Sequence, residues 1–421
     1  MSLNLAGYQC TLCGVHYDLD DVQYTCPADG GNLDVVLNYQ TIKSSVSPAG
    51  LFSSRELSLW RYLPLIPTSD PGGSGTPLRA AGYTPIFSPP PLSKQLGLNE
   101  LWIKDESRNP TASFKDRASA VVVARARDIS AEVIVTASTG NAGAALAGMS
   151  AAVGQKAVIF APRTAPPAKI AQLLIFGAQV MLVDGTYDDA FDLTIEAANT
   201  FGWYCRNTGY NPFTVEGKKT AAFEIWEWMQ TNHLPALSHK PLSIFVSVGD
   251  GNIISGIHKG FKDLQQLGWL EQMPRLFGVQ AEGSAAIANA FQSGTELITP
   301  VSANTIADSI SVDLPRDGVR AVRAAAQTGG NYILVSDAEI ITAIASLGRV
   351  GIFAEPAGAA AFAGLQKAVL GGDILPEDPV LVVNTGSGLK DVKAAMQAVK
   401  PAPVIEPTLA ALQRVMKQID D

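Results

Sequence analysis

One lysine lies where a reactive amine would be useful. Residues 109–117 read Asn-Pro-Thr-Ala-Ser-Phe-Lys-Asp-Arg, and the Asn-Pro pair predicts a turn because proline continues neither a helix nor a central strand. Residues 118–127 are rich in Ala and Arg without Gly or Pro, which predicts a helix capped by Ser113 with Lys115 in its first turn. The helix dipole disfavours a cation there, so the Lys115 amine would lose its proton easily and could form a Schiff base with an aldehyde. The alternative is an ordinary surface lysine in a charged run.

A second polar turn follows a predicted strand and opens a helix. Residues 137–143 read Ala-Ser-Thr-Gly-Asn-Ala-Gly, and such a turn presents backbone N–H groups to an anion. Ser138, Thr139 and Asn141 add side-chain donors, which suits a carboxylate. The alternative is a common strand-to-helix turn with Asn141 as its cap.

A third turn, at residues 247–253, combines Gly249, Asp250, Gly251 and Asn252. Two glycines let the backbone approach a phosphate closely. The spacing matches neither a dinucleotide fingerprint nor a P-loop, so a single phosphate is the simplest ligand. The carboxylate of Asp250 would repel that phosphate, and we therefore expect its side chain to point outward.

Two further turns complete the set. Thr385 lies in a Gly-rich turn after the last predicted strand, where it could bond a ring nitrogen. Glu355 precedes a predicted helix and is read either as a ligand contact or, slightly preferred, as a helix-start carboxylate. A reactive amine with turns for a carboxylate, a phosphate and a ring nitrogen predicts a site for pyridoxal 5'-phosphate and an amino acid. Zinc-hydrolase, catalytic-triad and nicotinamide interpretations each lack a part.

The N-terminal segment carries three of the four cysteines. Cys10, Cys13 and Cys26 with Asp29 form two knuckles of a zinc-ribbon-like layout, in which Asp29 stands where a fourth cysteine would complete the set. His16 is an alternative fourth ligand. A ribbon that keeps its fold without metal is the other interpretation. This cysteine pattern suits a reducing, cytoplasmic setting.

The elements that must position these turns alternate along the chain. Apolar runs predict strands at 101–104, 133–136, 157–160, 180–183, 244–248, 276–279 and 380–383. Helices are expected near 142–153, 166–176, 187–200, 217–231, 253–268, 316–328, 337–348 and 357–370. Buried β-branched strands between helices indicate an α/β protein with parallel sheets, in two lobes with the active site between them. Residues 41–85, rich in Ser, Pro and Gly, predict an extended arm over the body.

Composition excludes several classes of partner. The chain has 421 residues, more than one hydrophobic core usually holds, with a net charge of −8. This charge argues against nucleic acid or an acidic membrane surface as the main partner. No apolar run approaches the length of a membrane span, and the N-terminus lacks the basic region of a signal peptide.

Six ordered motifs within residues 58–392 resemble those of the threonine synthases, in the tryptophan synthase β-like group of pyridoxal-phosphate enzymes. They are residues 109–117, 138–141, 183–190, 215–220, 355–360 and 385–391. The N-terminal ribbon resembles one that some members carry. The resemblance implies a two-lobed fold and a homodimer. It predicts a ribbon at 1–40, a large cofactor-binding domain with an N-terminal arm at 41–115 and 210–421, and a small α/β domain at 116–209.

The resemblance also implies roles for the residues named above. Lys115 would form the Schiff base and shuttle protons. Asn141 would bond the ring hydroxyl oxygen, the 249–252 turn would hold the phosphate, and Thr385 would meet the pyridine nitrogen. Ser138 and Thr139 would hold the substrate carboxylate. The implied reaction converts O-phospho-L-homoserine and water to L-threonine and phosphate.

Two departures from the family pattern concern the substrate. Ala142 replaces a common Thr, and Thr214 stands where the family often has an Arg that helps to bind the substrate phosphate. Lys169, Asn207 and Thr208 could still serve. The departures keep a second hypothesis open: a related eliminase, dehydratase or β-replacement enzyme acting on serine, threonine, phosphoserine or a diamino acid. A non-catalytic paralogue that binds the cofactor is a third, which the presence of Lys115 disfavours.

Overall fold

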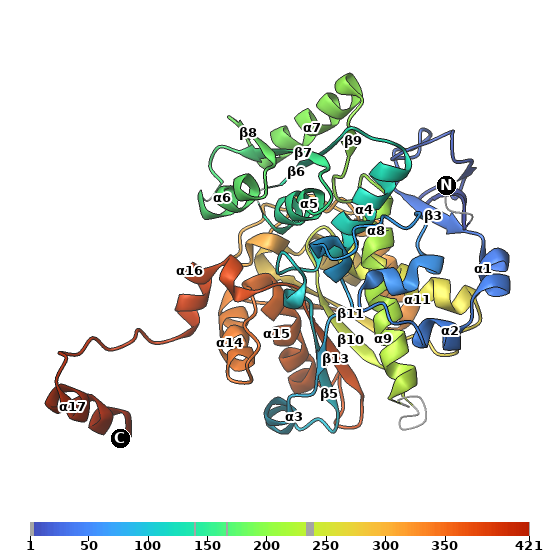
Figure 1. Ribbon diagram of the computed structural model, residues 1–421. Coiled ribbons are helices and arrows are strands. Elements are labelled where there is room, and N and C mark those ends of the chain that lie inside the picture. Colours follow the sequence, from blue (N-terminus) through green and yellow to red (C-terminus); the bar gives the residue numbers. More distant parts are fainter. Residues whose placement is uncertain (1–3, 139, 166, 233–239, 421) are drawn as a thin grey trace.

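The computed structural model describes residues 4–138, 140–165, 167–232 and 240–420 of the chain. Its core contains two mainly parallel sheets flanked by helices, with a small antiparallel sheet at the N-terminus (Figure 1). This α/β architecture is the one that the alternating apolar runs predicted. Within the described residues, no helix is both long and apolar enough to cross a membrane.

The larger sheet has six strands in the order β12-β11-β10-β13-β5-β4. Their bounds are β12 Tyr332–Val335, β11 Arg275–Ala281, β10 Ser243–Ser247, β13 Val380–Asn384, β5 Leu101–Asp105 and β4 Ile86–Phe87. All neighbours are parallel except the edge strand β4, which pairs antiparallel with β5. The central strands β10 and β13 are buried at every residue, which explains their continuous apolar sequences. The turns after these two strands therefore open at the same edge of the sheet.

The smaller sheet has four parallel strands in the order β8-β7-β6-β9. They are β8 Gln179–Val183, β7 Lys156–Pro162, β6 Val133–Ala137 and β9 Tyr204–Cys205, connected through α5 Asn141–Ala151, α6 Pro167–Ile175 and α7 Tyr187–Phe201. All four strands fall within residues 116–209. The three-part domain division itself stays a prediction.

The remaining helices surround the larger sheet or connect the two sheets. They are α3 Pro90–Leu96, α4 Lys115–Asp128, α8 Phe213–Lys218, α9 Thr220–Thr231, α11 Asn252–Gln266, α12 Ala286–Gln292, α13 Gly318–Thr328, α14 Asp337–Gly348, α15 Pro356–Gly371, α16 Val392–Ala395 and α17 Leu409–Asp420. The helix expected at 217–231 is two consecutive helices, α8 and α9, which are separated at Lys219. In Figure 1, α17 lies away from the body at the end of an extended connection.

The N-terminal ribbon is an antiparallel sheet in the order β2-β1-β3, formed by β1 Leu5–Cys10, β2 His16–Tyr17 and β3 Leu33–Leu37. The arm that follows is less extended than its composition predicted. It folds into α1 Tyr39–Ser45, α2 Pro48–Phe52 and the 3-10 helices η1 Leu59–Leu65 and η2 Pro77–Ala80. The reason is burial: Trp60 and Tyr62 are core residues, and Arg61 forms an ion pair of 2.6 Å with Glu227 of α9.

Candidate active site

Helix α4 begins at Lys115, which confirms the position predicted for this lysine. The predicted cap was wrong: Phe114 is the N-cap residue, and the hydroxyl of Ser113 has no hydrogen-bond partner among the described residues. The backbone explains the difference. Ser113 forms an isolated bridge with Gly386, and Phe114 N–H donates to the carbonyl of Thr385 at 2.9 Å. The turn after β13 thus sets the start of α4.

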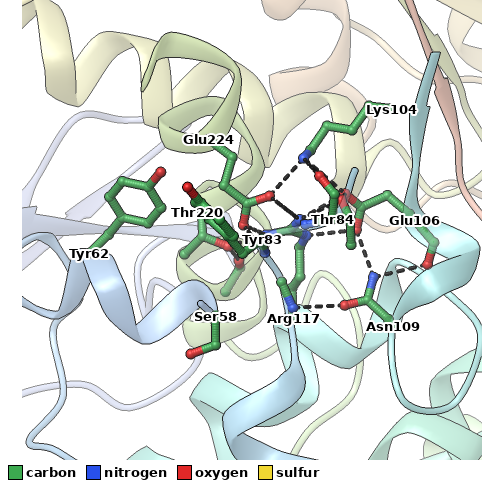
Figure 2. A network of polar contacts seen from close by, with 12 residues as sticks. Ser58, Tyr62, Tyr83, Thr84, Lys104, Glu106, Asn109, Arg117, Thr220 and Glu224 are labelled. Atoms are coloured by element: carbon green, nitrogen blue, oxygen red, sulfur yellow. Dashed lines mark hydrogen bonds and ion pairs between the residues drawn. The ribbon is translucent and has the colours of Figure 1, made fainter. Parts of the chain in front are cut away.

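A buried network of charges fixes the first turn of this helix. Figure 2 shows Arg117 between two glutamates, with Nε 2.7 Å from Glu106 Oε2 and Nη1 2.5 Å from Glu224 Oε1. Lys104 Nζ donates to Glu224 Oε2 at 2.7 Å from the other side. These four side chains come from β5, the segment after it, α4 and α9, so the network ties Lys115 to the larger sheet.

The Lys115 amine has a lowered pKa, as predicted, but for a different main reason. Burial is the largest cause, and the nearby guanidinium of Arg206 adds to it, while Glu355 and Asp250 act in the opposite direction. The helix dipole was expected to lower the pKa as well, but burial is the largest cause. An amine in this setting is well suited to act as a nucleophile and proton carrier.

Lys115 lies where a wide cavity meets a narrow recess. The cavity has a volume of about 360 Å³, and its lining includes Ser138, Asn141, Ala142, Thr208 and Asp250. The recess, of about 30 Å³, is lined by Lys115, Thr208, Lys218, residues 247–253, Ser309, Ile310, Glu355, Ala357 and Thr385. The structure therefore brings together the predicted amine, phosphate turn and Thr385 at the recess, and the amine with Ser138 and Asn141 at the cavity. Thr139 lies outside the described residues.

Asn141 and Glu355 contact each other across the site. Asn141 Nδ2 donates to Glu355 Oε1 at 2.8 Å. Glu355 is the N-cap residue of α15, as the preferred interpretation expected, but its side chain makes no capping bond among the described residues. Its carboxylate contacts Asn141 instead. Burial raises the pKa of Glu355, and the nearby Lys115 only partly offsets this. The contact orients the Asn141 amide at the edge of the cavity.

The glycines of the 249–252 turn allow a close approach of backbone segments. A Cβ at Gly249 would lie 2.8 Å from the Cα of Ile310, and Gly251 has a φ of +89° that favours glycine. Asn252 begins α11, where its Nδ2 donates to Asp317 Oδ2 at 2.6 Å and its Oδ1 accepts from Lys218 Nζ. Asp317, the N-cap residue of α13, and Lys218 of α8 thus hold the side chain at the end of this turn in place.

Asp250 corrects one expectation. Its carboxylate was predicted to point outward, but the residue lines both the cavity and the recess. Its Oδ1 accepts from the backbone N–H of Arg316 at 3.3 Å, which holds the side chain on the inner side. Burial raises its pKa, so its negative charge is disfavoured at this position.

Ser138 and Thr385 occupy the predicted turns, and the Ser138 hydroxyl already accepts two hydrogen bonds. The Ser138 hydroxyl accepts from the backbone N–H groups of Gly140 at 3.2 Å and Gly143 at 2.9 Å, and it lines the wide cavity. Thr385 is buried and lines the recess near Glu355. Both positions suit contacts with a bound group.

The prediction missed two buried cations, Lys218 and Arg206. Lys218 lines the recess, and its pKa lies well below the usual value through burial and the nearby charges of Arg206 and Lys115. It belongs to the 215–220 motif, so the sequence held a signal that was not assigned a role. Thr214, in contrast, is fully buried, donates to the carbonyl of Asn211 at 2.8 Å, and lies 3.3 Å from Asn252 Oδ1.

The other residues considered for the substrate differ in position. Thr208 lines both the cavity and the recess, whereas Lys169 forms an ion pair with Asp308 at the cavity. Asn207 is buried, and its Oδ1 accepts from the backbone N–H of Ala137 at 2.8 Å. Asn207 therefore supports the end of β6, which precedes the Ser138 turn.

The ribbon brings four potential metal ligands together. One ligand atom each from Cys10, Cys13, Cys26 and Asp29 lies within 4.8 Å of the others. Cys10 Sγ is 3.3 Å from Asp29 Oδ1, and the sulfurs of Cys13 and Cys26 are 3.8 Å apart. His16 is not part of this group among the described residues. The arrangement favours Asp29 over His16 as the fourth ligand.

Comparisons with known proteins agree with this site. Residues 78–386 match the family described as pyridoxal-phosphate dependent enzyme. A threonine synthase of Methanocaldococcus jannaschii is 38% identical over 414 residues, covering 98% of this chain and 99% of the relative. A threonine synthase of Methanosarcina acetivorans is 34% identical over 412 residues, covering 97% and 98%.

Solved structures support the fold independently. The processed form of threonine deaminase isoform 2 from Solanum lycopersicum superposes with a TM-score of 0.65 at 24% identity, covering 82% of this chain and 94% of that chain. Diaminopropionate ammonia lyase from Escherichia coli gives a TM-score of 0.64 at 20% identity, covering 82% and 93%. With the family match and the full-length relatives, these findings confirm that the chain belongs to the threonine synthase family of pyridoxal-phosphate dependent enzymes.

Proposed function

We propose that the protein converts O-phospho-L-homoserine and water to L-threonine and phosphate, with pyridoxal 5'-phosphate as its cofactor. The observation that carries the proposal is Lys115 at the junction of the cavity and the recess, in a chain aligned over 98% of its length with a threonine synthase. A phosphorylated amino acid has room in a cavity of about 360 Å³.

The residues of the recess fit this cofactor. Lys218 is a buried cation beside a Gly-rich turn, and the absence of a Cβ at Gly249 and Gly251 lets other groups approach the backbone of that turn closely. Lys115 would hold the aldehyde carbon, residues 249–252 with Lys218 the phosphate, Thr385 the ring nitrogen and Asn141 the ring hydroxyl oxygen. When bound, the cofactor supplies an electron sink for charge at the amino acid's α-carbon.

The protein's own groups would orient the amino acid and move its protons. We assign the substrate carboxylate to the 138–141 turn, because it precedes the N-terminus of α5, which begins at Asn141 and where the helix dipole favours an anion. Lys115 Nζ would take and return protons at the α- and β-carbons, because burial lowers its pKa toward the working pH. Glu355 would keep Asn141 in place through their 2.8 Å hydrogen bond.

The direct test is turnover by the purified protein loaded with pyridoxal phosphate. Equal amounts of threonine and phosphate are expected from O-phospho-L-homoserine. The Lys115→Ala variant should bind the cofactor without its protein-bound absorbance band and should form no threonine. If the wild-type protein released neither product, the proposal would be wrong.

A second candidate function is elimination or β-replacement on serine, threonine, phosphoserine or a diamino acid. It is favoured by Ala142, which places a methyl group in the cavity lining, and by Thr214, which is buried behind Asn252. Release of an α-keto acid from a panel of these amino acids would identify elimination, and formation of a new β-substituted amino acid in the presence of an added nucleophile would identify β-replacement. A panel without turnover, combined with threonine formation from O-phospho-L-homoserine, would exclude it.

We also propose a zinc ion in the N-terminal ribbon and a homodimeric assembly. Three thiolates and one carboxylate are a suitable tetrahedral donor set for zinc, and a structural zinc would link the two knuckles of the folded ribbon. Light scattering of the purified protein at several concentrations tests the dimer. A mass of one chain at all concentrations would contradict it.

A further inference from the structure

Arg206 is a buried guanidinium that forms no ion pair with any described residue. It follows β9 and is fully buried, yet its Nη2 has no hydrogen-bond partner among the described residues. The bonds that it makes go to neutral hydroxyls: Nη1 donates to Thr208 Oγ1 at 2.8 Å, and Nε lies 3.4 Å from Ser119 Oγ. Because an isolated buried charge is costly, such a group is expected to meet an anion.

The position of Arg206 points to the active site. Ser119 lies four residues after Lys115 on α4, so the two side chains share one face of the helix, one turn apart. Thr208 lines both the cavity and the recess. The Arg206 guanidinium, held by these two hydroxyls, is close enough for its charge to act on Lys115 and is separated from both spaces by their lining residue Thr208.

The charged residues that line the wide cavity include no unpaired arginine that could bind an anionic substrate group, among the described residues. Its lining includes Arg316, but Arg316 Nη2 is already paired with Asp188 Oδ1 at 2.6 Å. Lys218 is turned to the recess, where it bonds Asn252. Asp250 and Asp313 also line the cavity and would repel an anion. Lys115 and Lys218 have roles in the proposed function, so Arg206 is the cation near this wall, among the described residues, that still lacks one.

We propose that Arg206 forms, with Thr208, a subsite for the phosphate group of the amino-acid substrate, separate from the turn that holds the cofactor's phosphate. This inference deepens the proposed function and rests on it. An arginine fork suits a phosphate because parallel N–H groups can contact two oxygens at once. Thr208 provides a hydroxyl on the cavity side of the same subsite and fixes the guanidinium through Nη1. Small local adjustment of Thr208 would bring the free Nη2 and the phosphate together.

The test uses two ligands that differ only in the anionic group, L-2-amino-5-phosphonopentanoate and L-norvaline. Their dissociation constants are measured with the cofactor-loaded protein from the change in the cofactor's absorbance, so turnover is not needed. The wild-type protein should bind the phosphonate more tightly. In Arg206→Met the phosphonate affinity should fall about 10- to 100-fold, the value expected for a lost charged hydrogen bond. L-norvaline, measured at saturating cofactor, should bind within about twofold of wild type, since it has no group that reaches the subsite.

Two further variants keep the result decisive. Arg206→Lys, which keeps the charge but not the fork, should restore part of the preference. Thr208→Val should lower it without removing a charge, and replaces Arg206→Met if that variant does not fold. An unchanged phosphonate preference in all variants would overturn the inference, as would a loss confined to cofactor affinity. Failure of the proposed function would be a different result, namely no formation of threonine. The preference for the phosphonate is measured without turnover, so it would still test the subsite.

Discussion

Arg117 donates two hydrogen bonds to Glu224, from Nη1 to Oε1 at 2.5 Å and from Nη2 to Oε2 at 2.7 Å, although the residues are 107 positions apart in the sequence. Both side chains are buried, and Lys104 Nζ bonds the same carboxylate at 2.7 Å (Figure 2). Arg117 lies two residues after Lys115. The pair therefore connects the reactive lysine to α9 and to the larger sheet.

Removing the Glu224 carboxylate should destabilise the fold strongly. In Glu224→Ala the cations of Arg117 and Lys104 lose a buried partner, and the free energy of unfolding should fall by about 3–5 kcal/mol. The matched control is Glu132→Ala, which removes an exposed partner of Lys156 and should cost less than about 1 kcal/mol. Urea denaturation measures both. Equal small effects would show that the network adds little to stability.

The same pair predicts a pH dependence. Burial alone would raise the pKa of Glu224, but the charges of Arg117 and Lys104 outweigh it and lower the pKa from 4.5 to about 2. Because the pKa is lower in the folded than in the unfolded protein, this stabilisation is complete above about pH 4.5 and is lost as the pH falls toward 2. The stability difference between wild type and Glu224→Gln should therefore shrink between pH 5 and pH 3. A constant difference would contradict the lowered pKa.

The sequence predicted the central elements well because they carry strong local signals. The β-branched runs of β10 and β13 are buried on both faces, and each strand was found where such a run occurs. β9 has only two residues and carries too short a pattern to recognise. The motif turns also ended at the expected residues, since Gly and Asn mark strand-to-helix turns.

The details that were missed depend on contacts distant in sequence. Ser113 does not cap α4 because its backbone pairs with Gly386, and Asp250 faces inward because it accepts from the N–H of Arg316. Arg206 and Lys218 are buried near Lys115 only because the fold brings these distant segments together. A one-dimensional pattern contains neither burial nor the direction of a side chain.

Lys218→Met should separate binding of the cofactor's phosphate from binding of its ring. Lys218 lines the phosphate recess, so the variant should bind pyridoxal 5'-phosphate about 10- to 100-fold more weakly but should bind pyridoxal as wild type does. Lys156→Met, which changes an exposed lysine, is the control and should leave both affinities unchanged. Equal losses for both ligands would indicate a structural role instead.

Lys218 also predicts a proton linked to cofactor binding. Burial, with the charges of Arg206 and Lys115, holds its pKa well below the usual value, which disfavours the ammonium form in the empty recess. A bound phosphate would favour that form, so binding should take up protons and weaken as the pH rises. Calorimetry in buffers of different ionisation enthalpy measures this uptake. It should be smaller in Lys218→Met, and an unchanged uptake would assign the proton elsewhere.

The metal prediction can be tested with two cysteine variants. Cys26 belongs to the group of ligand atoms in the ribbon, whereas Cys205 is buried in β9 of the smaller sheet. Protein purified without chelator should contain about one zinc per chain, and Cys26→Ser should lose it while Cys205→Ser keeps it. A chelator should also lower the melting temperature of wild type, because a structural metal stabilises only the folded ribbon. Wild-type protein without zinc would support the metal-free ribbon.

Gly217 holds α8 close to the helix that carries Lys115. A Cβ at this position would lie 2.2 Å from the carbonyl oxygen of Arg117, a backbone atom that cannot move without shifting α4. Gly217→Ala should therefore lower the free energy of unfolding by at least about 1–3 kcal/mol and reduce cofactor occupancy. Gly348→Ala is the matched control in α14. A Cβ there meets nothing within 4 Å among the described residues, so alanine should be neutral or stabilise by up to about 1 kcal/mol. Equal stability of the two variants would show that α4 and α8 can separate at little cost, and that the position of Lys115 does not depend on this contact.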